Sequence, residues 1–252
     1  MGTSPTVMVV VTQPKHPLTE ARYNAWYSDN HLPYVLFSEG FPSAGRFRQG
    51  HVIKGSMTPY IAFYQADHAD QEAAQAAYAA ISRQGIGDRW NESPGDSLEI
   101  DWWAYYTRIG ETGSPDPASP TGAVLVTFAH PDGGRGATGL FLADELEAWY
   151  QAFMADLQAS PLVRGSTLYR LGLPAGGPTP SRYLSIHELA CGDDDLADVH
   201  AALIPHMTGG QADHQRSIAA GSPVAIDFWG YYRHIATHLK TTEDELLARR
   251  GD

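Results

Sequence analysis

Cysteine is nearly absent from the sequence, since Cys191 is the only one in 252 residues. A single thiol excludes an internal disulfide and is typical of a chain that folds in a reducing compartment. Long apolar runs are missing as well. The run Val7-Met8-Val9-Val10-Val11 is too short to span a bilayer and has no basic residues ahead of it, so we interpret it as a strand and not as a signal peptide. These absences predict a cytoplasmic protein.

Basic residues are scarce, with 17 Lys and Arg against 29 Asp and Glu and a net charge of −12. This balance argues against nucleic acid and anionic membrane surfaces as partners, because both are bound through clustered Lys and Arg. Aromatic residues are plentiful at 11%, including 6 Trp and 13 Tyr. They fill cores, and they also line pockets for flat or apolar ligands. We therefore expect a small molecule as the partner.

Three short segments occur twice in the same order, and this repetition predicts a tandem duplication. The matches are Ala25-Trp26-Tyr27 with Ala148-Trp149-Tyr150, Tyr60-Ile61-Ala62-Phe63 with Tyr183-Leu184-Ser185-Ile186, and Ile100-Asp101-Trp102-Trp103-Ala104-Tyr105-Tyr106 with Ile226-Asp227-Phe228-Trp229-Gly230-Tyr231-Tyr232. We call residues 1–110 module one and residues 123–240 module two. Residues 111–122, rich in Pro, Gly and Ser, are the predicted linker, and residues 241–252 are a predicted helical tail that begins with the capping-box pattern of Thr242 and Glu245.

Each module is predicted to run strand, helix, strand, strand, helix, strand, which is the ferredoxin-like order of an α+β fold. In module one the expected strands are 7–12, 44–52, 60–65 and 98–108, and the expected helices are 20–37 and 71–83. Helices cover one face of such a sheet, and the other face must be buried by something else. We expect the two sheets to bury each other as an α+β barrel within one chain, an intramolecular pseudo-dimer. A homodimer of whole chains remains open.

The segment from Tyr23 to Pro33, followed by Gly40-Phe41 and Arg46-Phe47-Arg48, resembles the EthD-like branch of the dimeric α+β barrel superfamily. The shared features are an aromatic pair, a His-x-Pro a few residues later, a glycine, and a strand that carries arginine. The resemblance implies a functional histidine in the His-x-Pro, which is His31 here. In module two it extends to the layout and the strands but not to the His-x-Pro, and it leaves the chemistry open, because the superfamily includes many enzyme types.

His31 is the main catalytic candidate. Tyr23, Tyr27 and His31 are spaced four residues apart and so share one helical face. Pro33 should end or kink the helix near Leu32. A histidine at such a place is suited to acid–base chemistry near neutral pH, although it can also serve only to bond a backbone carbonyl.

Other polar and aromatic residues of module one are weaker candidates. Tyr27 can donate a hydrogen bond to a substrate oxygen, and Asp29 can assist His31, although two residues along a helix it points elsewhere. The predicted substrate-binding residues are Tyr23, Tyr34, Arg48, His51, Tyr64 and Trp102. Many of these residues can equally be structural, and the sequence does not fix which way the strand residues face.

Comparison of the modules predicts one reactive site, in module one, with module two as a degenerate scaffold. Met154 stands opposite His31, so the titratable group is lost from module two. Arg48 is retained as Arg170, which favours a shared structural role for that pair. His187 opposite Tyr64 is the residue with which module two could have gained a pocket of its own.

No metal or cofactor is expected. The 11 histidines are scattered without ligand spacing, no axial haem ligand stands out, and no nucleotide-binding loop or nucleophile elbow occurs. The leading hypothesis is an enzyme, a cofactor-independent lyase, isomerase or cyclase that acts on an apolar aromatic or polyketide-like compound through His31. The alternatives are a cofactor-free monooxygenase of phenolic substrates and a non-catalytic small-molecule binding protein.

Overall fold

The computed structural model describes residues 5–16, 20–83, 98–116, 122–131, 143–177, 181–192, 194–207, 224–240, 242 and 244–245. Module one contains β1 (Thr6–Pro14), α1 (Glu20–Trp26), the π-helical turn η2 (Tyr27–His31), α2 (Leu32–Leu36), β2 (Ser43–Lys54), β3 (Tyr60–Ala66), α3 (Gln71–Arg83) and β4 (Leu98–Gly113). Module two contains β5 (Ala123–Pro131), α5 (Ala143–Gln158), β6 (Val163–Gly176), β7 (Tyr183–Leu189), α6 (Leu196–Met207) and β8 (Val224–Leu239). The predicted α+β class is confirmed.

The strands close into one barrel in the order β1-β3-β2-β8-β5-β7-β6-β4. Each module contributes the ferredoxin-like sheet order, β4-β1-β3-β2 in module one and β8-β5-β7-β6 in module two. The edge strands join the modules, since β2 pairs with β8 and β4 pairs with β6, both antiparallel. The modules thus form the expected intramolecular barrel. It is hydrogen-bonded all the way round, because pairing satisfies the backbone groups that each free edge would expose.

Alternation along the strands sorts the side chains into an inner and an outer layer. In β1, Val7, Val9 and Val11 belong to a buried cluster that draws on the strands of both modules and fills the barrel. Met8 and Val10 point the other way and pack with the helices of module one. A third cluster lies between the sheet and the helices of module two. A buried layer therefore exists between helices and sheet in each module.

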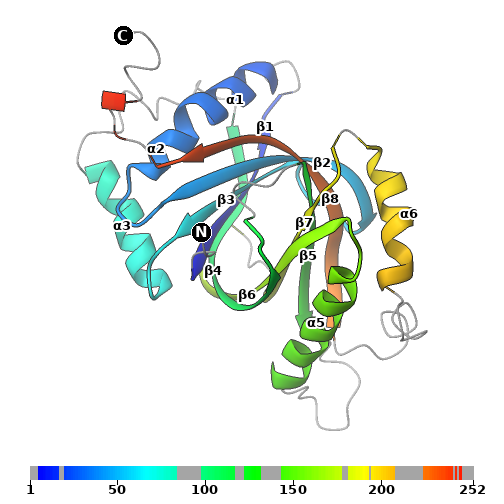
Figure 1. Ribbon diagram of the computed structural model, residues 1–252. Coiled ribbons are helices and arrows are strands. Elements are labelled where there is room, and N and C mark those ends of the chain that lie inside the picture. Colours follow the sequence, from blue (N-terminus) through cyan, green and yellow to red (C-terminus); the bar gives the residue numbers. More distant parts are fainter. Residues whose placement is uncertain are drawn as a thin grey trace.

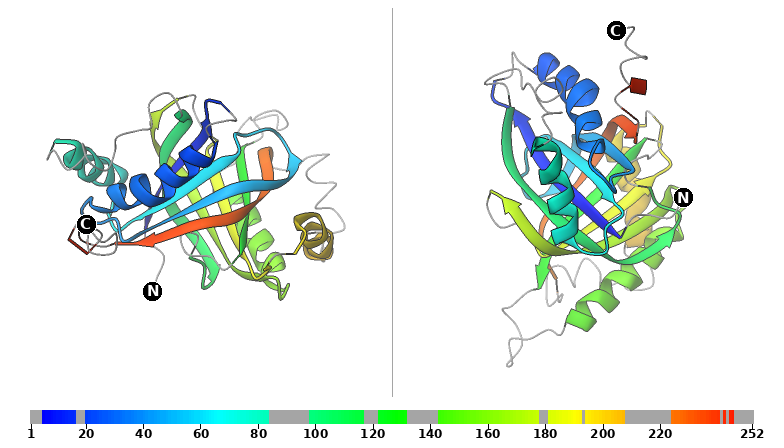
Figure 2. Two further views of the ribbon diagram at one scale, coloured as in Figure 1. Left: turned by 90° about the horizontal axis from the view of Figure 1, so that it is seen from above. Right: turned by 90° about the vertical axis from the view of Figure 1, so that its left-hand side faces the viewer.

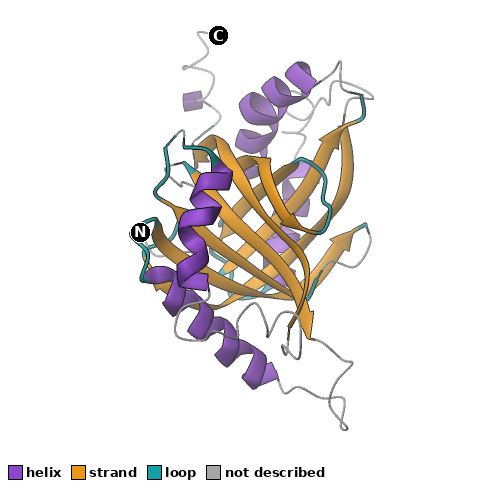
Figure 3. Ribbon diagram, turned by 90° about the vertical axis from the view of Figure 1, so that its right-hand side faces the viewer, coloured by secondary structure: helices purple, strands orange, loops and turns teal. Residues whose placement is uncertain are grey.

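The helices lie outside the barrel on opposite sides (Figure 1). The helices α1, α2 and α3 cover the sheet of module one, and α5 and α6 cover that of module two; the further views show the strands enclosed between these two groups (Figures 2 and 3). Among the described residues, no helix has the length and hydropathy that crossing a membrane requires.

The predicted element boundaries are mostly close, with one clear error at the end of module one. The strand β4 runs to Gly113, past the predicted end at Arg108, because it stays paired with β6 as far as Gly165. It thereby enters the predicted linker, whose residues 117–121 lie outside the described part. Most of the predicted tail also lies outside the described part. Its capping box is present: the Thr242 amide donates to Glu245 Oε2 (3.0 Å) and the Glu245 amide donates to Thr242 Oγ1 (3.2 Å).

Candidate functional site

The first helix of module one widens into a π turn around His31. The Leu32 amide donates to the Tyr27 carbonyl, five residues back, and ordinary helix resumes through Pro33 to Leu36. Pro33 therefore does not end the helix, and its kink takes the form of a π turn. Proline has no N–H and crowds the carbonyl one turn earlier, and a widened turn relieves that conflict. Such turns occur often at functional sites, and the matching helix of module two, α5, is described as unbroken α-helix.

His31 lies half-buried in an aromatic cage at the end of this turn. Its ring stacks on Trp26 with centroids 5.0 Å apart and planes 27° apart. Tyr27 meets it edge-on at 4.8 Å, and Tyr34 lies at 6.3 Å. The flanking rings fix the orientation of the imidazole and leave part of it open to solvent. We call His31, Trp26, Tyr27 and Tyr34 the His31 cage.

The predicted tyrosines of module one do gather in this layer. The Tyr64 hydroxyl donates to the Tyr27 hydroxyl at 3.1 Å, and Tyr23 packs edge-on against Tyr27. The Tyr23 hydroxyl in turn bonds Thr12 Oγ1 at 2.6 Å. Burial raises the pKa of Tyr27 and of Tyr64 above the ordinary value, so both stay protonated. Since Tyr27 accepts from Tyr64, it keeps its own proton for donation.

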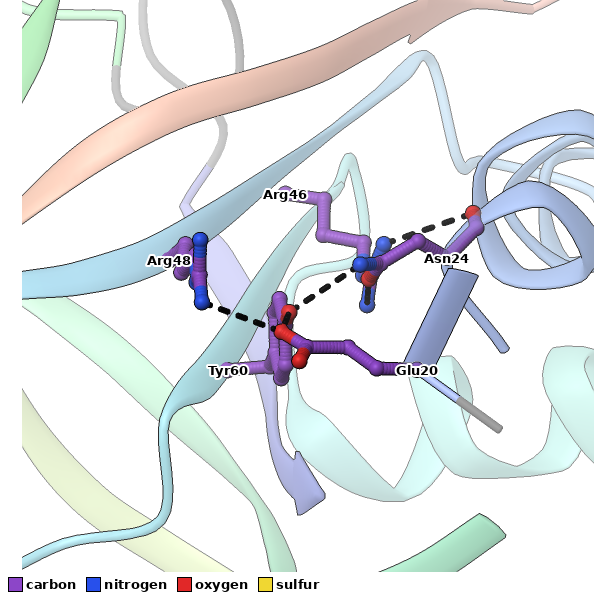
Figure 4. Close-up of polar contacts among 5 residues, drawn as sticks. All are labelled: Glu20, Asn24, Arg46, Arg48 and Tyr60. Atoms are coloured by element: carbon purple, nitrogen blue, oxygen red, sulfur yellow. Dashed lines mark hydrogen bonds and ion pairs between the residues drawn. The ribbon is translucent and has the colours of Figure 1, made fainter. Parts of the chain in front are cut away.

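Arg46 is the residue of this layer that the sequence reasoning missed. It is 1% exposed, and its guanidinium carbon lies 4.7, 4.6 and 4.6 Å from the ring centres of Tyr23, Tyr27 and Tyr60. It donates to Asn24 Oδ1 at 2.7 Å (Figure 4). No carboxylate of the described residues forms an ion pair with it, and its Nε has no hydrogen-bond partner among them. A buried positive charge thus lies beneath the π turn.

Arg48, the predicted arginine, lies on the same strand face but further out. Its side chain is 59% exposed and pairs with Glu20 Oε1 at 3.1 Å (Figure 4). Tyr60 also bonds Glu20. In module two, Arg170 forms the corresponding contact from strand to first helix, with Glu147 at 3.2 Å. The ion pair in both modules fits the structural role that retention of this arginine suggested.

Two other predicted residues, His51 and Trp102, lie away from the His31 cage. His51 faces module two, where its ring lies 5.8 Å from His200 beside a groove of about 310 Å³. Trp102 belongs to the cluster inside the barrel and meets Phe128 edge-on at 5.3 Å, so the sheet separates it from the helices. Its neighbour Trp103 faces the helices instead and contacts Tyr78. Asp29 is exposed on the π turn.

Module two carries different groups at the equivalent places. Met154, opposite His31, is fully buried, and Leu168 stands where module one has Arg46. His187, which the sequence places opposite Tyr64, is buried, and its ring nitrogens bond the hydroxyls of Ser185 (3.0 Å) and Ser166 (2.8 Å). Burial lowers the pKa of His187 from 6.5 to about 3, so the ring is neutral near pH 7.

The buried His187 predicts a loss of stability in mild acid. The pKa of His187 is lower in the folded chain than in the unfolded one. The stability that the neutral buried ring contributes is therefore complete above pH 6.5 and is lost as the pH falls from 6.5 to about 3. Between pH 7 and pH 5 we expect the free energy of unfolding to fall by about 2 kcal/mol from this group alone. Urea unfolding at pH 7 and at pH 5 measures this fall in the free energy of unfolding. In His187→Gln, which cannot titrate, the fall should be smaller by that amount, and an equal fall in both proteins would contradict the assignment.

The described residues contain no group of three or more His, Cys, Asp or Glu placed to hold a metal ion.

No protein-family model matches the chain, and no curated protein matches it by sequence. Solved structures share its fold, among them the following two. An anthrone oxidase-like protein has 14% identity and a TM-score of 0.53, with 94% of each chain covered. A protein of Fusobacterium nucleatum named as a candidate monooxygenase has 8% identity and a TM-score of 0.52, with 94% of this chain and 95% of that chain covered. At these identities the likeness shows the fold alone.

Proposed function

We propose that this chain is a cofactor-independent enzyme in which His31 removes a proton from an apolar aromatic substrate. The observation that carries the proposal is the His31 cage. A half-buried imidazole held between Trp26 and Tyr27 combines a base suited to neutral pH with a flat aromatic surface beside it. Module two, with Met154 at this position, offers no such base.

The charge distribution of the layer supports an anionic intermediate. Removal of a proton from a phenol, or from carbon next to a carbonyl group, leaves negative charge on oxygen. The buried guanidinium of Arg46, which no described carboxylate pairs, favours such a charge through a low-dielectric medium. The Tyr27 hydroxyl, which accepts from Tyr64, has its own proton to donate to the same oxygen.

We favour oxidation by molecular oxygen as the fate of that anion. An anion of an anthrone-like methylene can react with oxygen directly. One oxygen atom becomes the new carbonyl, the other leaves as water with the two hydrogens of the methylene, and no outside reductant is needed. Solved structures with this fold include an anthrone oxidase-like protein and a candidate monooxygenase, and their names support this direction.

A lyase, isomerase or cyclase reaction is the second candidate. It would use the same proton transfer at His31, with Tyr27 returning or sharing the proton, and would need no oxygen. The anion-stabilising groups around the cage suit this chemistry equally well. The two candidates therefore differ in whether oxygen is consumed.

The consumption of oxygen decides between them. With anthrone as the substrate, we expect the chain to consume one molecule of oxygen for each molecule of anthrone oxidised, at a rate above that of the spontaneous reaction. An oxygen electrode and absorbance of the quinone product measure this ratio. No acceleration of oxygen uptake would reject the oxidase assignment. Conversion of a polyketide-like ketone at an unchanged rate without oxygen would support the second candidate, and tight binding without conversion would support a binding protein.

We further propose that the two modules arose by duplication within the EthD-like branch. The recurring segments and the repeated sheet order support duplication, and the π turn at the His-x-Pro is a local feature with which to compare members of that branch. The module boundaries at 110 and 123, the cytoplasmic location and the possible homodimer stay predictions.

A further inference from the structure

Module two has a narrow aromatic crevice between α5 and its sheet. The crevice is lined by Thr127, Trp149, Tyr150, Phe153, Ile226 and Trp229. Most of these side chains are aromatic and none is charged. Trp149, half-buried on α5, stacks on Phe153 with centroids 5.6 Å apart, so it forms part of the outer wall. The crevice is narrower than a water molecule, and a ring can enter only when this wall moves aside.

Two hydrogen-bond donors in the lining lack partners. The Tyr150 hydroxyl and Trp229 Nε1 are buried, and neither makes a hydrogen bond among the described residues; Tyr150 lies near Thr127 without meeting hydrogen-bond geometry. The two residues are 1% and 8% exposed. Buried donors are normally satisfied, and an unsatisfied one calls for an explanation such as a bound molecule. Both donors require an acceptor atom.

The lining also connects to a buried polar chain. Thr127 Oγ1 bonds Ser185 Oγ at 2.5 Å, Ser185 Oγ bonds His187 Nε2 at 3.0 Å, and His187 Nδ1 bonds Ser166 at 2.8 Å. A neutral histidine donates from one nitrogen and accepts at the other. With the proton on Nε2, His187 donates to Ser185 and Ser185 donates to Thr127. The Thr127 hydroxyl is then left to donate into the crevice. With the proton on Nδ1, the directions reverse and Thr127 ends as an acceptor.

We propose that module two binds a neutral, planar aromatic compound with a carbonyl-type acceptor oxygen in this crevice. Tyr150 and Trp229 donate hydrogen bonds to that oxygen, and Thr127 donates to it when the proton of His187 is on Nε2. Neutrality follows from the uncharged lining and from Leu168, which replaces the cation that module one has at Arg46. The two modules then select different forms of aromatic compound, an anion-forming one at His31 and a neutral one here. Module two is accordingly more than a scaffold. The proposal is independent of the reaction assigned to module one.

Binding of 1-indanone to the full chain tests the proposal, with indane, which lacks the oxygen, as the matched compound. We expect one molecule of 1-indanone per chain by calorimetry, with a Kd on the order of 1 mM as is usual for so small a ligand, and indane several-fold weaker. Tyr150→Phe and Trp229→Phe should each weaken 1-indanone binding roughly 3- to 10-fold, as loss of one hydrogen bond does. Tyr169→Phe is the control, because it removes a buried, unpaired hydroxyl of the same module from the barrel interior, and it should change nothing.

Two further measurements separate this site from the His31 cage and test the polar chain. His31→Gln should leave 1-indanone binding unchanged; if it abolishes binding, the compound occupies module one and the proposal fails. The ring-nitrogen NMR shifts of His187 should show the proton on Nε2 in the 1-indanone complex, because Thr127 must then donate. A proton on Nδ1 in the complex would overturn the role of the chain. Equal binding by the wild type, Tyr150→Phe and Trp229→Phe, or no binding by the wild type at several millimolar, would overturn the site.

Discussion

Replacement of His31 by glutamine should lower the turnover of anthrone by roughly 10²- to 10⁴-fold, which is the usual contribution of a general base. Glutamine keeps a polar group of similar size between Trp26 and Tyr27 but cannot accept a proton near pH 7. The loss should fall on kcat more than on KM, because the aromatic surface that holds the substrate remains. Steady-state oxygen uptake measures both constants.

A histidine outside the cage provides the control for this change. His206 is half-buried on α6 in module two, and His206→Gln should retain the turnover of the wild type. Circular dichroism should show both variants folded. Full activity in a folded His31→Gln protein would exclude His31 as the base, whatever the reaction.

Replacement of Arg46 by leucine should separate activity from stability. Leucine already occupies the equivalent position in module two, as Leu168, so the fold accommodates it. Burial of a charge without an ion-pair partner costs several kcal/mol, which contacts with aromatic rings and the bond to Asn24 offset. We therefore expect the free energy of unfolding to stay within about 1 kcal/mol of the wild type or to rise. Turnover should fall roughly 10²- to 10³-fold, as when an anion-stabilising donor is removed.

Arg170→Leu is the control. Arg170 is the module-two counterpart of Arg48, and its ion pair with Glu147 is partly exposed. The free energy of unfolding of Arg170→Leu should differ from that of the wild type by about 0–1 kcal/mol, and its turnover should be unchanged. Urea unfolding and oxygen uptake on the same samples give both quantities. Strong destabilisation of Arg46→Leu with unchanged turnover per folded molecule would show that Arg46 is structural.

The sequence placed the helix face of the candidate site well and singled out Arg48, whereas the arginine buried in this layer is Arg46. The four-residue spacing correctly put His31 beside Tyr27 and Tyr27 beside Tyr23, because contacts within one helix follow from its pitch. Retention in both modules suggests a structural role for Arg48, and loss from module two suggests a functional role for His31. The same criterion singles out Arg46, which has Leu168 opposite it in module two. For Trp102 and Trp103 no such signal existed, because an aromatic pair suits either face of a strand that is buried on both sides.

By itself, the sequence determined the order of elements, the repetition of segments and the α+β class, since periodicity, β-branched runs and recurring segments can all be recognised along the chain without knowing its contacts. Only the tertiary structure decided how β2 and β8, and β4 and β6, close the barrel, because any two free edges can pair and the choice depends on how the modules meet in space. It also decided that Arg46 is buried without a carboxylate and that Tyr150 and Trp229 lack acceptors. Whether a polar group is satisfied depends on atoms that residues distant in the sequence bring to within about 3 Å, and no local pattern records that distance.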